Sequence, residues 1–141
     1  MNIIKPNARK WIELMYDKLL LTENENVTFY FTVKGFADDP KVYLQPAYGG
    51  LEIGYEAVKW DGPSHPYLTL QKQHFLSREK LQSLSKEQQQ ELTLELLMKT
   101  IDSRKRQYRK CQFCGAKVAP EHRFNQNTCH GCASERFGVL Y

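Results

Sequence analysis

Four cysteines form the most specific chemical pattern in this sequence. Cys111 and Cys114 make one Cys-x-x-Cys pair, Cys129 and Cys132 make a second, and fourteen residues separate the pairs. Two residues between paired cysteines let one tight turn present both sulfurs to the same ion, and four thiolates complete the tetrahedral shell of a structural zinc site. The pattern therefore predicts that all four cysteines bind one structural Zn²⁺.

Redox and iron–sulfur chemistry are the other uses of paired cysteines. A thioredoxin-type dithiol needs a βαβ context that the surrounding sequence lacks, and ferredoxins space their cysteines differently. His122 and His130 lie in the same segment, but four cysteines already fill the metal shell, so we expect neither histidine to be a ligand. A filled shell leaves no position for a catalytic water, which disfavours zinc-dependent catalysis.

The segment from Cys111 to Tyr141 resembles the zinc-ribbon and treble-clef group of four-cysteine zinc fingers. The resemblance implies a metal-built module and no particular function. In a treble clef the second cysteine pair opens a helix, here beginning near Cys132, whereas a ribbon would place a last strand over 137–141. Gly138 and the few residues after it favour the ribbon-like form.

A basic run leads into the first cysteine pair. Residues 99–141 carry a formal charge of +6, whereas residues 1–98 carry −2, so a polyanion would be attracted to the C-terminal part. Lysine and arginine neutralise phosphates, and a tyrosine among them can stack on a base. A solvated helix end that suits the helix dipole is the simpler alternative. The predicted nucleic-acid contacts are Arg104, Lys105, Arg106, Tyr108, Arg109, Lys110, Arg123 and Arg136.

Residues 1–110 are predicted to form an α+β domain that ends in a long, basic-tipped helix, and residues 111–141 the zinc module. Alternating apolar residues and short turns favour a four-stranded antiparallel meander. Ser85 and Gln88 match a capping box. The expected elements are a helix over 8–21 capped by Asn7, strands over 27–34, 41–45, 51–59 and 67–71, a short helix over 77–84, and a helix over 86–110 whose last two turns project beyond the core.

Composition points to a non-enzymatic, intracellular binding protein. We expect a cytoplasmic location because the sequence shows neither the apolar core of a signal peptide nor an apolar run long enough to span a membrane. The preferred hypothesis is a nucleic-acid-associated, possibly regulatory, zinc protein, with DNA and RNA both open. The alternative is a protein–protein adaptor that docks a partner through the zinc module or through an aromatic sheet face around Tyr48, Trp60 and Tyr67.

Overall fold

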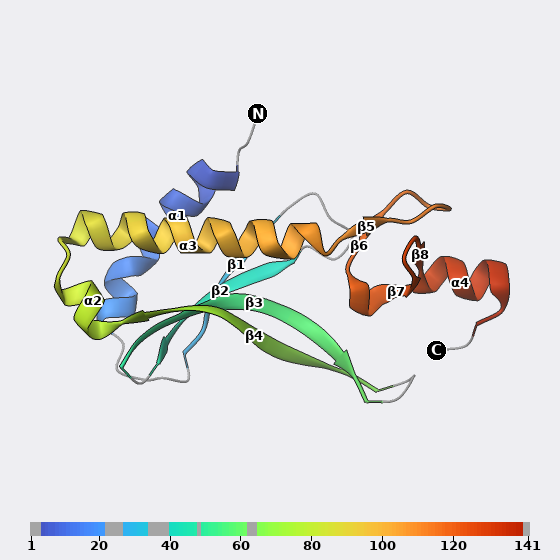
Figure 1. Ribbon diagram of the computed structural model, residues 1–141, viewed down its shortest axis with the longest axis horizontal. Helices are drawn as coiled ribbons and strands as arrows, with labels where there is room; N and C mark the ends of the chain where they lie inside the picture. Colours follow the sequence, from blue (N-terminus) through green and yellow to red (C-terminus); the bar gives the residue numbers. More distant parts are fainter. Residues whose placement is uncertain (1–3, 22–26, 34–39, 48, 62–64, 140–141) are drawn as a thin grey trace.

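The computed structural model describes residues 4–21, 27–33, 40–47, 49–61 and 65–139, with the side chains of the first helix described as far as Tyr16. Helices and a four-stranded sheet form the body of the molecule, and short strands with one helix follow it (Figure 1). The elements are α1 (Ile4–Leu21), β1 (Phe29–Thr32), β2 (Lys41–Ala47), β3 (Gly50–Trp60), β4 (Pro66–Ser77), α2 (Arg78–Gln82), α3 (Lys86–Arg106), β5 (Arg109–Lys110), β6 (Lys117–Val118), η1 (Pro120–His122), β7 (Arg123–Asn125), β8 (Thr128–Cys129) and α4 (His130–Phe137).

The predicted antiparallel meander is confirmed. The strands lie in the order β1-β2-β3-β4, and each pairs antiparallel with the next. Strand β4 is much longer than the predicted 67–71, because it follows β3 over nearly its whole length after a register shift beside Ile53 and Gly54. The residues from Gln71 to His74 are all polar, so they do not show the alternation of apolar and polar residues that would have predicted this continuation.

One face of the sheet is covered by α1 and α3, which lie on the same side of it in Figure 1. Helical spacing explains the burial of Ala8, Ile12 and Tyr16 on α1, while Leu14 is exposed. The buried core consists of Ala8, Ile12, Tyr16, Val33, Val42, Leu44, Leu51, Ile53, Tyr55, Leu76, Leu94, Leu97 and Ile101.

The starts of α2 and α3 agree with their sequence signals, but the predicted end of the long helix at residue 110 is wrong, because α3 ends at Arg106 and β5 begins at Arg109. Ser85 and Gln88 form the predicted reciprocal capping box of α3, and Ser77 caps α2. Helix α1 begins at Ile4, so the prediction that Asn7 caps it is wrong. Pro6 lies in the first turn, where its missing N–H has no helical partner to lose, and the helix therefore starts ahead of it.

The C-terminal end of α3 is packed against the sheet. The prediction that its last two turns project beyond the core is wrong, because Arg104 is 4% exposed and Tyr108 is 6% exposed. Leu97, Ile101, Arg104 and Tyr108 follow one another at helical spacing along a single buried stripe. The stripe thus continues through an arginine and beyond the end of the helix at Arg106.

Candidate metal centre

The residues from β5 to α4, which we call the cysteine module, form two small hairpins and a helix. Strands β5 and β6 pair antiparallel, with Cys111 and Cys114 in the turn between them. Strands β7 and β8 form the second hairpin, and α4 follows at once, with Cys129 at its N-cap and Cys132 in its first turn. The backbone N–H of Gln112 donates to the carbonyl of Asn127 at 2.7 Å, which ties the two hairpins together.

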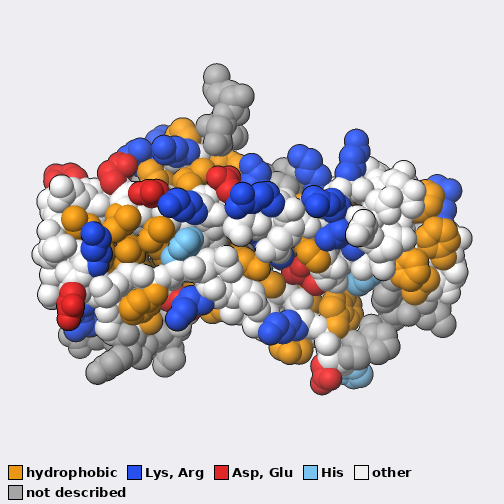
Figure 2. All heavy atoms as spheres, viewed as in Figure 1, with side chains coloured by type: hydrophobic (Ala, Val, Ile, Leu, Met, Phe, Trp, Pro, Cys, Tyr) orange, Lys and Arg blue, Asp and Glu red, His pale blue; other side chains and the backbone are white. Residues whose placement is uncertain are grey.

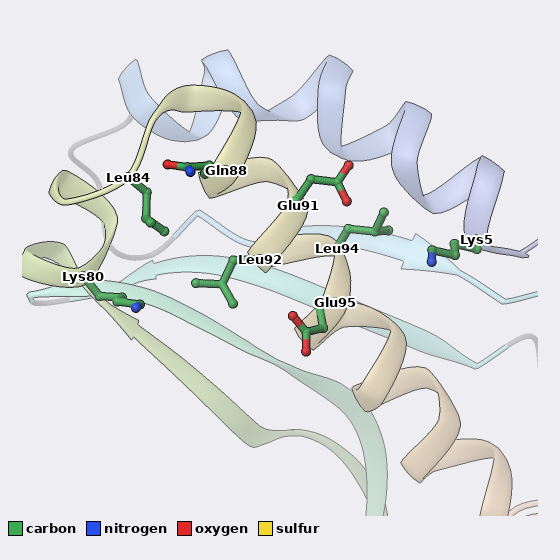
Figure 3. A pocket seen from close by; sticks show the side chains of 8 residues that line it. All are labelled: Lys5, Lys80, Leu84, Gln88, Glu91, Leu92, Leu94 and Glu95. Carbon is green, nitrogen blue, oxygen red and sulfur yellow. The ribbon is translucent and has the colours of Figure 1, made fainter.

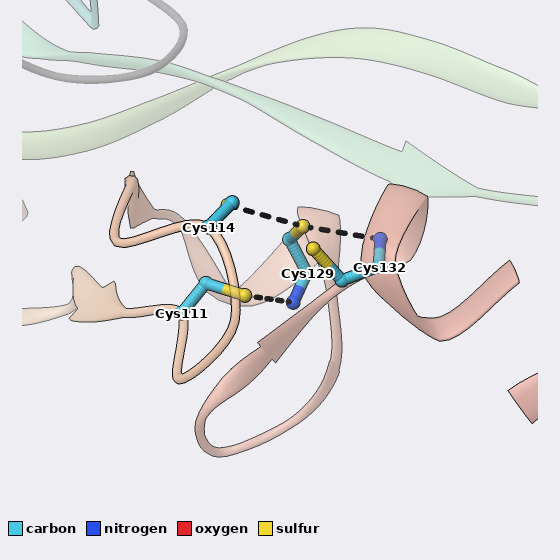
Figure 4. Close-up of side chains that lie close together, drawn as sticks. All are labelled: Cys111, Cys114, Cys129 and Cys132. Atoms are coloured by element: carbon cyan, nitrogen blue, oxygen red, sulfur yellow. Dashed lines mark hydrogen bonds between the residues drawn. The ribbon is translucent and has the colours of Figure 1, made fainter. Parts of the chain in front are cut away.

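The four cysteine sulfurs converge on one point, as Figure 4 shows. All four lie within 4.8 Å of one another, and the Sγ atoms of Cys114 and Cys129 are 3.9 Å apart. Sulfurs at the corners of a tetrahedron about a Zn²⁺ ion, each about 2.3 Å from it, are separated by roughly 3.8 Å. The observed cluster therefore has the donor set and the spacing to hold one metal ion.

Backbone geometry stabilises thiolate at this cluster. The N–H of Cys129 donates to the Sγ of Cys111 at 3.5 Å, and the N–H of Cys132 donates to the Sγ of Cys129 at 3.4 Å. Hydrogen bonds from the backbone, first that of Cys114, lower the pKa of Cys111 to about 6, whereas the side chain of Cys129 raises the pKa of Cys132 to about 12. All four thiols can ionise together only if a cation offsets the repulsion between the thiolates, and a divalent metal ion bound among the sulfurs would do so.

Two glycines near the cysteines have different roles. Gly115 adopts a positive φ of 76° directly after the first pair, as expected for a tight turn, and its N–H donates to the carbonyl of Cys111. Gly131, between the cysteines of the second pair, lies in the first turn of α4 without a positive φ. Gly138 instead supplies the left-handed residue, with a φ of 69°, that ends α4.

The second cysteine pair opens a helix, which is the feature that separates the treble-clef expectation from the ribbon-like one. A knuckle, a hairpin and a helix opened by the second cysteine pair follow one another, and α4 extends to Phe137. The ribbon-like prediction, which made Phe137 the start of a last strand, is therefore wrong at that residue. Among the described residues, the group that can hold a metal contains the four cysteines and neither His122 nor His130. These two rings lie near each other, and His130 packs against Trp60 of β3.

A buried ion pair attaches the cysteine module to the body. Glu121 of η1 receives two hydrogen bonds from Arg104 of α3, at 2.5 and 3.2 Å, and both side chains are less than 10% exposed. The backbone N–H of Val58 also donates to the Glu121 carboxylate. Burial alone would raise the pKa of Glu121, but the hydrogen bonds from Arg104 and from backbone N–H groups outweigh it and hold that pKa below its ordinary value.

Aromatic rings complete this attachment. The guanidinium of Arg104 lies 4.8 Å from the ring centre of Tyr55 and 5.3 Å from that of Tyr108, one on the sheet and one after α3. The indole N–H of Trp60 donates to the carbonyl of Glu121 at 2.7 Å. Sequence reasoning missed Glu121. The available signal was the position of Arg104 on the buried helical stripe, which requires a buried acidic partner.

Burial separates the predicted nucleic-acid contacts into buried, half-buried and exposed residues. Arg104 and Tyr108 are buried in the attachment, so they cannot contact a nucleic acid at the surface, and the prediction is corrected for these two. Arg123 is half-buried and donates to the carbonyls of Gln107 and Gln126. Lys105 is half-buried. The exposed residues of the predicted set are Arg106, Arg109, Lys110 and Arg136.

An open hollow lies far from the cysteines, between the start of α1, α2 and α3 (Figure 3). It encloses about 500 Å³ and is lined by Leu84, Leu92 and Leu94, with charged side chains at its rim. The carboxylate of Glu91 is already paired with Arg9 of α1. The lining contains no cysteine, serine or histidine side chain.

Comparison with protein-family models, with curated proteins and with solved structures gives no match to this chain. Within the described part of the chain, no helix combines the length and apolar character needed to cross a membrane. Function must therefore be argued from the cysteine module, its attachment and the charges around it.

Proposed function

We propose that this protein binds nucleic acid through a cationic surface whose shape is held by a structural Zn²⁺ ion. The four cysteines would hold the ion, whose role is to fix the fold of a module with very little apolar core of its own. That core consists of Cys111, Val118 and Cys132, with Ala116 and Cys129 beside them. A segment with so few apolar side chains gains most of its folding free energy from metal binding.

The proposal rests on a cluster of positively charged side chains where α3 meets the cysteine module. Lys110 of β5 lies directly opposite Lys117 of β6, and like charges in that position destabilise a hairpin. The pKa of Arg123 is lowered from its ordinary value, first by partial burial of its side chain and second by the positive charge of the nearby Arg109. A polyanion on this surface would turn both repulsions into favourable contacts.

The shape of this cationic surface fits an extended anion. We define the cationic surface as Arg106, Arg109, Lys110 and Lys117, all of which are exposed. Figure 2 shows Lys and Arg side chains in a row over the C-terminal part of α3 and onto the neighbouring hairpin, with few acidic side chains among them. Four thiolates around a Zn²⁺ ion carry a formal charge of −2, which reduces the charge of residues 99–141 from +6 to +4 and leaves it positive.

Salt dependence is the direct test. Fluorescence anisotropy with labelled single-stranded DNA, duplex DNA and RNA should show binding that weakens steeply as salt rises, with a logarithmic slope of about −0.9 per neutralised phosphate on a duplex. The double variant Lys110→Ala with Lys117→Ala should reduce that slope by about 2. The matched control removes two exposed charges from α2, Arg78→Ala with Lys80→Ala, and should leave the slope unchanged. Absence of salt-dependent binding to all three probes would overturn the proposal.

A protein partner at the sheet edge is a second candidate function, favoured by one observation. Strand β4 pairs only with β3 among the described strands, and its outer part carries the exposed apolar residues Tyr67, Leu68, Leu70 and Phe75. An exposed edge strand is a site where an extended segment of another protein can add a further strand. Of the other two residues predicted for an aromatic sheet face, Trp60 donates a hydrogen bond to Glu121 of the cysteine module, and Tyr48 lies outside the described residues.

The two candidates separate in one experiment. A partner at the β4 edge would stay bound to the immobilised protein after nuclease treatment and would be lost from the variant Leu68→Glu with Leu70→Glu. Retention by that variant, or loss of the partner with nuclease, would exclude this second candidate. The cationic surface is left intact in the variant, so nucleic-acid binding serves as its folding control.

A further inference from the structure

Three phenylalanines from different parts of the cysteine module meet at its surface. Phe113 lies in the turn between Cys111 and Cys114, Phe124 lies on β7, and Phe137 is the last residue of α4. The ring of Phe137 lies 5.8 Å from that of Phe113 and 5.9 Å from that of Phe124, measured between centroids. We call these three side chains the aromatic patch.

The aromatic patch is not the core of the module. Its members are 38%, 47% and 51% exposed in sequence order, whereas the buried cluster of the module consists of cysteines and small aliphatic residues. Figure 2 shows apolar side chains gathered at the end of the molecule where α4 lies, with a basic side chain beside them. Large apolar side chains that converge on solvent from three elements mark a binding surface.

Charge distinguishes this patch from an ordinary apolar contact. The guanidinium of Arg136 lies over the ring of Phe113 at 4.8 Å from its centroid, so a planar cation extends the aromatic surface. Rings and guanidinium planes are the groups on which unpaired bases stack. A base pair inside a duplex offers no free face to such a surface, because its neighbours already cover both faces.

The aromatic patch adjoins the cationic surface at the turn that holds Cys111 and Cys114. The side chain of Lys110 lies beside Gly115, since a Cβ placed on that glycine would be 3.6 Å from the Cε atom of Lys110. Phe113 is two residues from Gly115 in the same turn. Phosphates on the cationic surface and bases on the aromatic patch can therefore belong to one strand.

We infer that the aromatic patch stacks unpaired nucleobases, so that the nucleic acid bound by the cationic surface is single-stranded. This inference rests on the proposed function and specifies its substrate class. In this arrangement Lys110 and its neighbours neutralise the phosphates, and Phe113, Phe124 and Phe137 receive bases without reading their sequence. Preference for a single strand then comes from the rings, while salt dependence comes from the cations.

The test distinguishes binding by stacking on the rings from binding by burial of apolar surface. The probes are a labelled oligothymidine of twelve nucleotides, an oligouridine of the same length and a twelve-base-pair duplex, each at low salt. The double variant Phe124→Leu with Phe137→Leu keeps apolar side chains but removes two ring faces, and should weaken binding to both single strands at least about tenfold. The matched variant Phe124→Trp with Phe137→Trp keeps the faces and should retain binding.

Each outcome bears on a different claim. Tighter binding of single strands than of duplex, lost in the leucine variant with an unchanged salt slope and unchanged metal content, supports the inference. Equal affinity for single strand and duplex, unaltered by leucine, would overturn the inference and leave the proposed function standing. Failure of the wild-type protein to bind any probe would overturn the proposed function and the inference with it.

Discussion

The body and the cysteine module are held together by opposite means. The body buries a continuous set of large apolar side chains between its sheet and the helices α1 and α3, and burial of apolar surface is the main driving force of folding. The module buries little besides its own cysteines and small residues, and its helix has eight residues. An isolated helix of that length is unstable in water. We therefore propose that the body folds by hydrophobic burial and that the cysteine module needs metal coordination to fold.

Metal removal should have the largest effect, because it should unfold the cysteine module and leave the body folded. Chelation with EDTA, or the variant Cys111→Ser, should unfold the module and leave the body folded, because structural zinc sites supply on the order of 10 kcal/mol of folding free energy. Amide NMR spectra should lose the dispersed signals of Thr128 and Ala133 and retain those of Leu44 and Ile53. Retention of the module signals in the chelated protein would show that coordination is not what orders it.

The buried ion pair should give the next largest effect. Glu121→Ala leaves Arg104 charged and buried, and removal of one partner from such a pair costs about 3–5 kcal/mol. Urea unfolding should show a free energy of unfolding that is lower by this amount. The control variant Glu135→Ala, which removes an exposed carboxylate from α4, should leave the free energy of unfolding nearly unchanged. The double variant Arg104→Met with Glu121→Leu should recover much of the loss. Equal stability of Glu121→Ala and wild type would contradict the attachment described here.

High pH should weaken the body through Tyr43. This fully buried tyrosine donates a hydrogen bond to Glu52, and burial, followed by that bond, raises its pKa well above the ordinary value. The neutral form is favoured in the folded state, so the contribution of Tyr43 is fully present below about pH 10 and is lost as pH rises toward its folded pKa.

Unfolding measurements between pH 9 and 11 test this effect. The wild-type body should approach an extra loss of about 1.4 kcal/mol per pH unit above pH 10, and Tyr43→Phe should lack that component. A wild-type slope equal to that of Tyr43→Phe would show that Tyr43 ionises in the folded protein as it does in the unfolded chain.

The capping box of α3 should give the smallest effect. Ser85→Ala removes the side-chain acceptor of the Gln88 N–H and should cost about 1 kcal/mol in the stability of the body. Metal affinity of the module should be unchanged, because Ser85 lies at the opposite end of α3. A change in metal affinity as large as the change in stability would indicate that body and module fold as one unit.

Local patterns were enough to predict much of this structure. The spacing of Cys111, Cys114, Cys129 and Cys132 predicted their convergence because each pair lies within one turn of chain. The meander followed from alternating residues and short connections, and the start of α3 followed from Ser85 and Gln88. In each case the residues that decide the structure are neighbours in the sequence.

The errors arose where distant residues decide the structure. Arg104 was read as a surface cation because Glu121, seventeen residues later, was not recognised as its partner. Helical spacing from Leu97 and Ile101 would have placed Arg104 on the buried face. The helix after the second cysteine pair was considered but judged less favourable than a last strand, because Gly138 would cut it short; in the structure Gly138, with its positive φ, ends an eight-residue helix. The convergence of Phe113, Phe124 and Phe137 has no signature in sequence spacing.

Native mass spectrometry of the intact chain tests most directly the claim that coordination builds the cysteine module. The chain should carry one Zn²⁺ ion that replaces thiol protons, and Cys111→Ser or Cys132→Ser should abolish this binding. A metal-free chain whose cysteine module is nevertheless folded by NMR would contradict the claim.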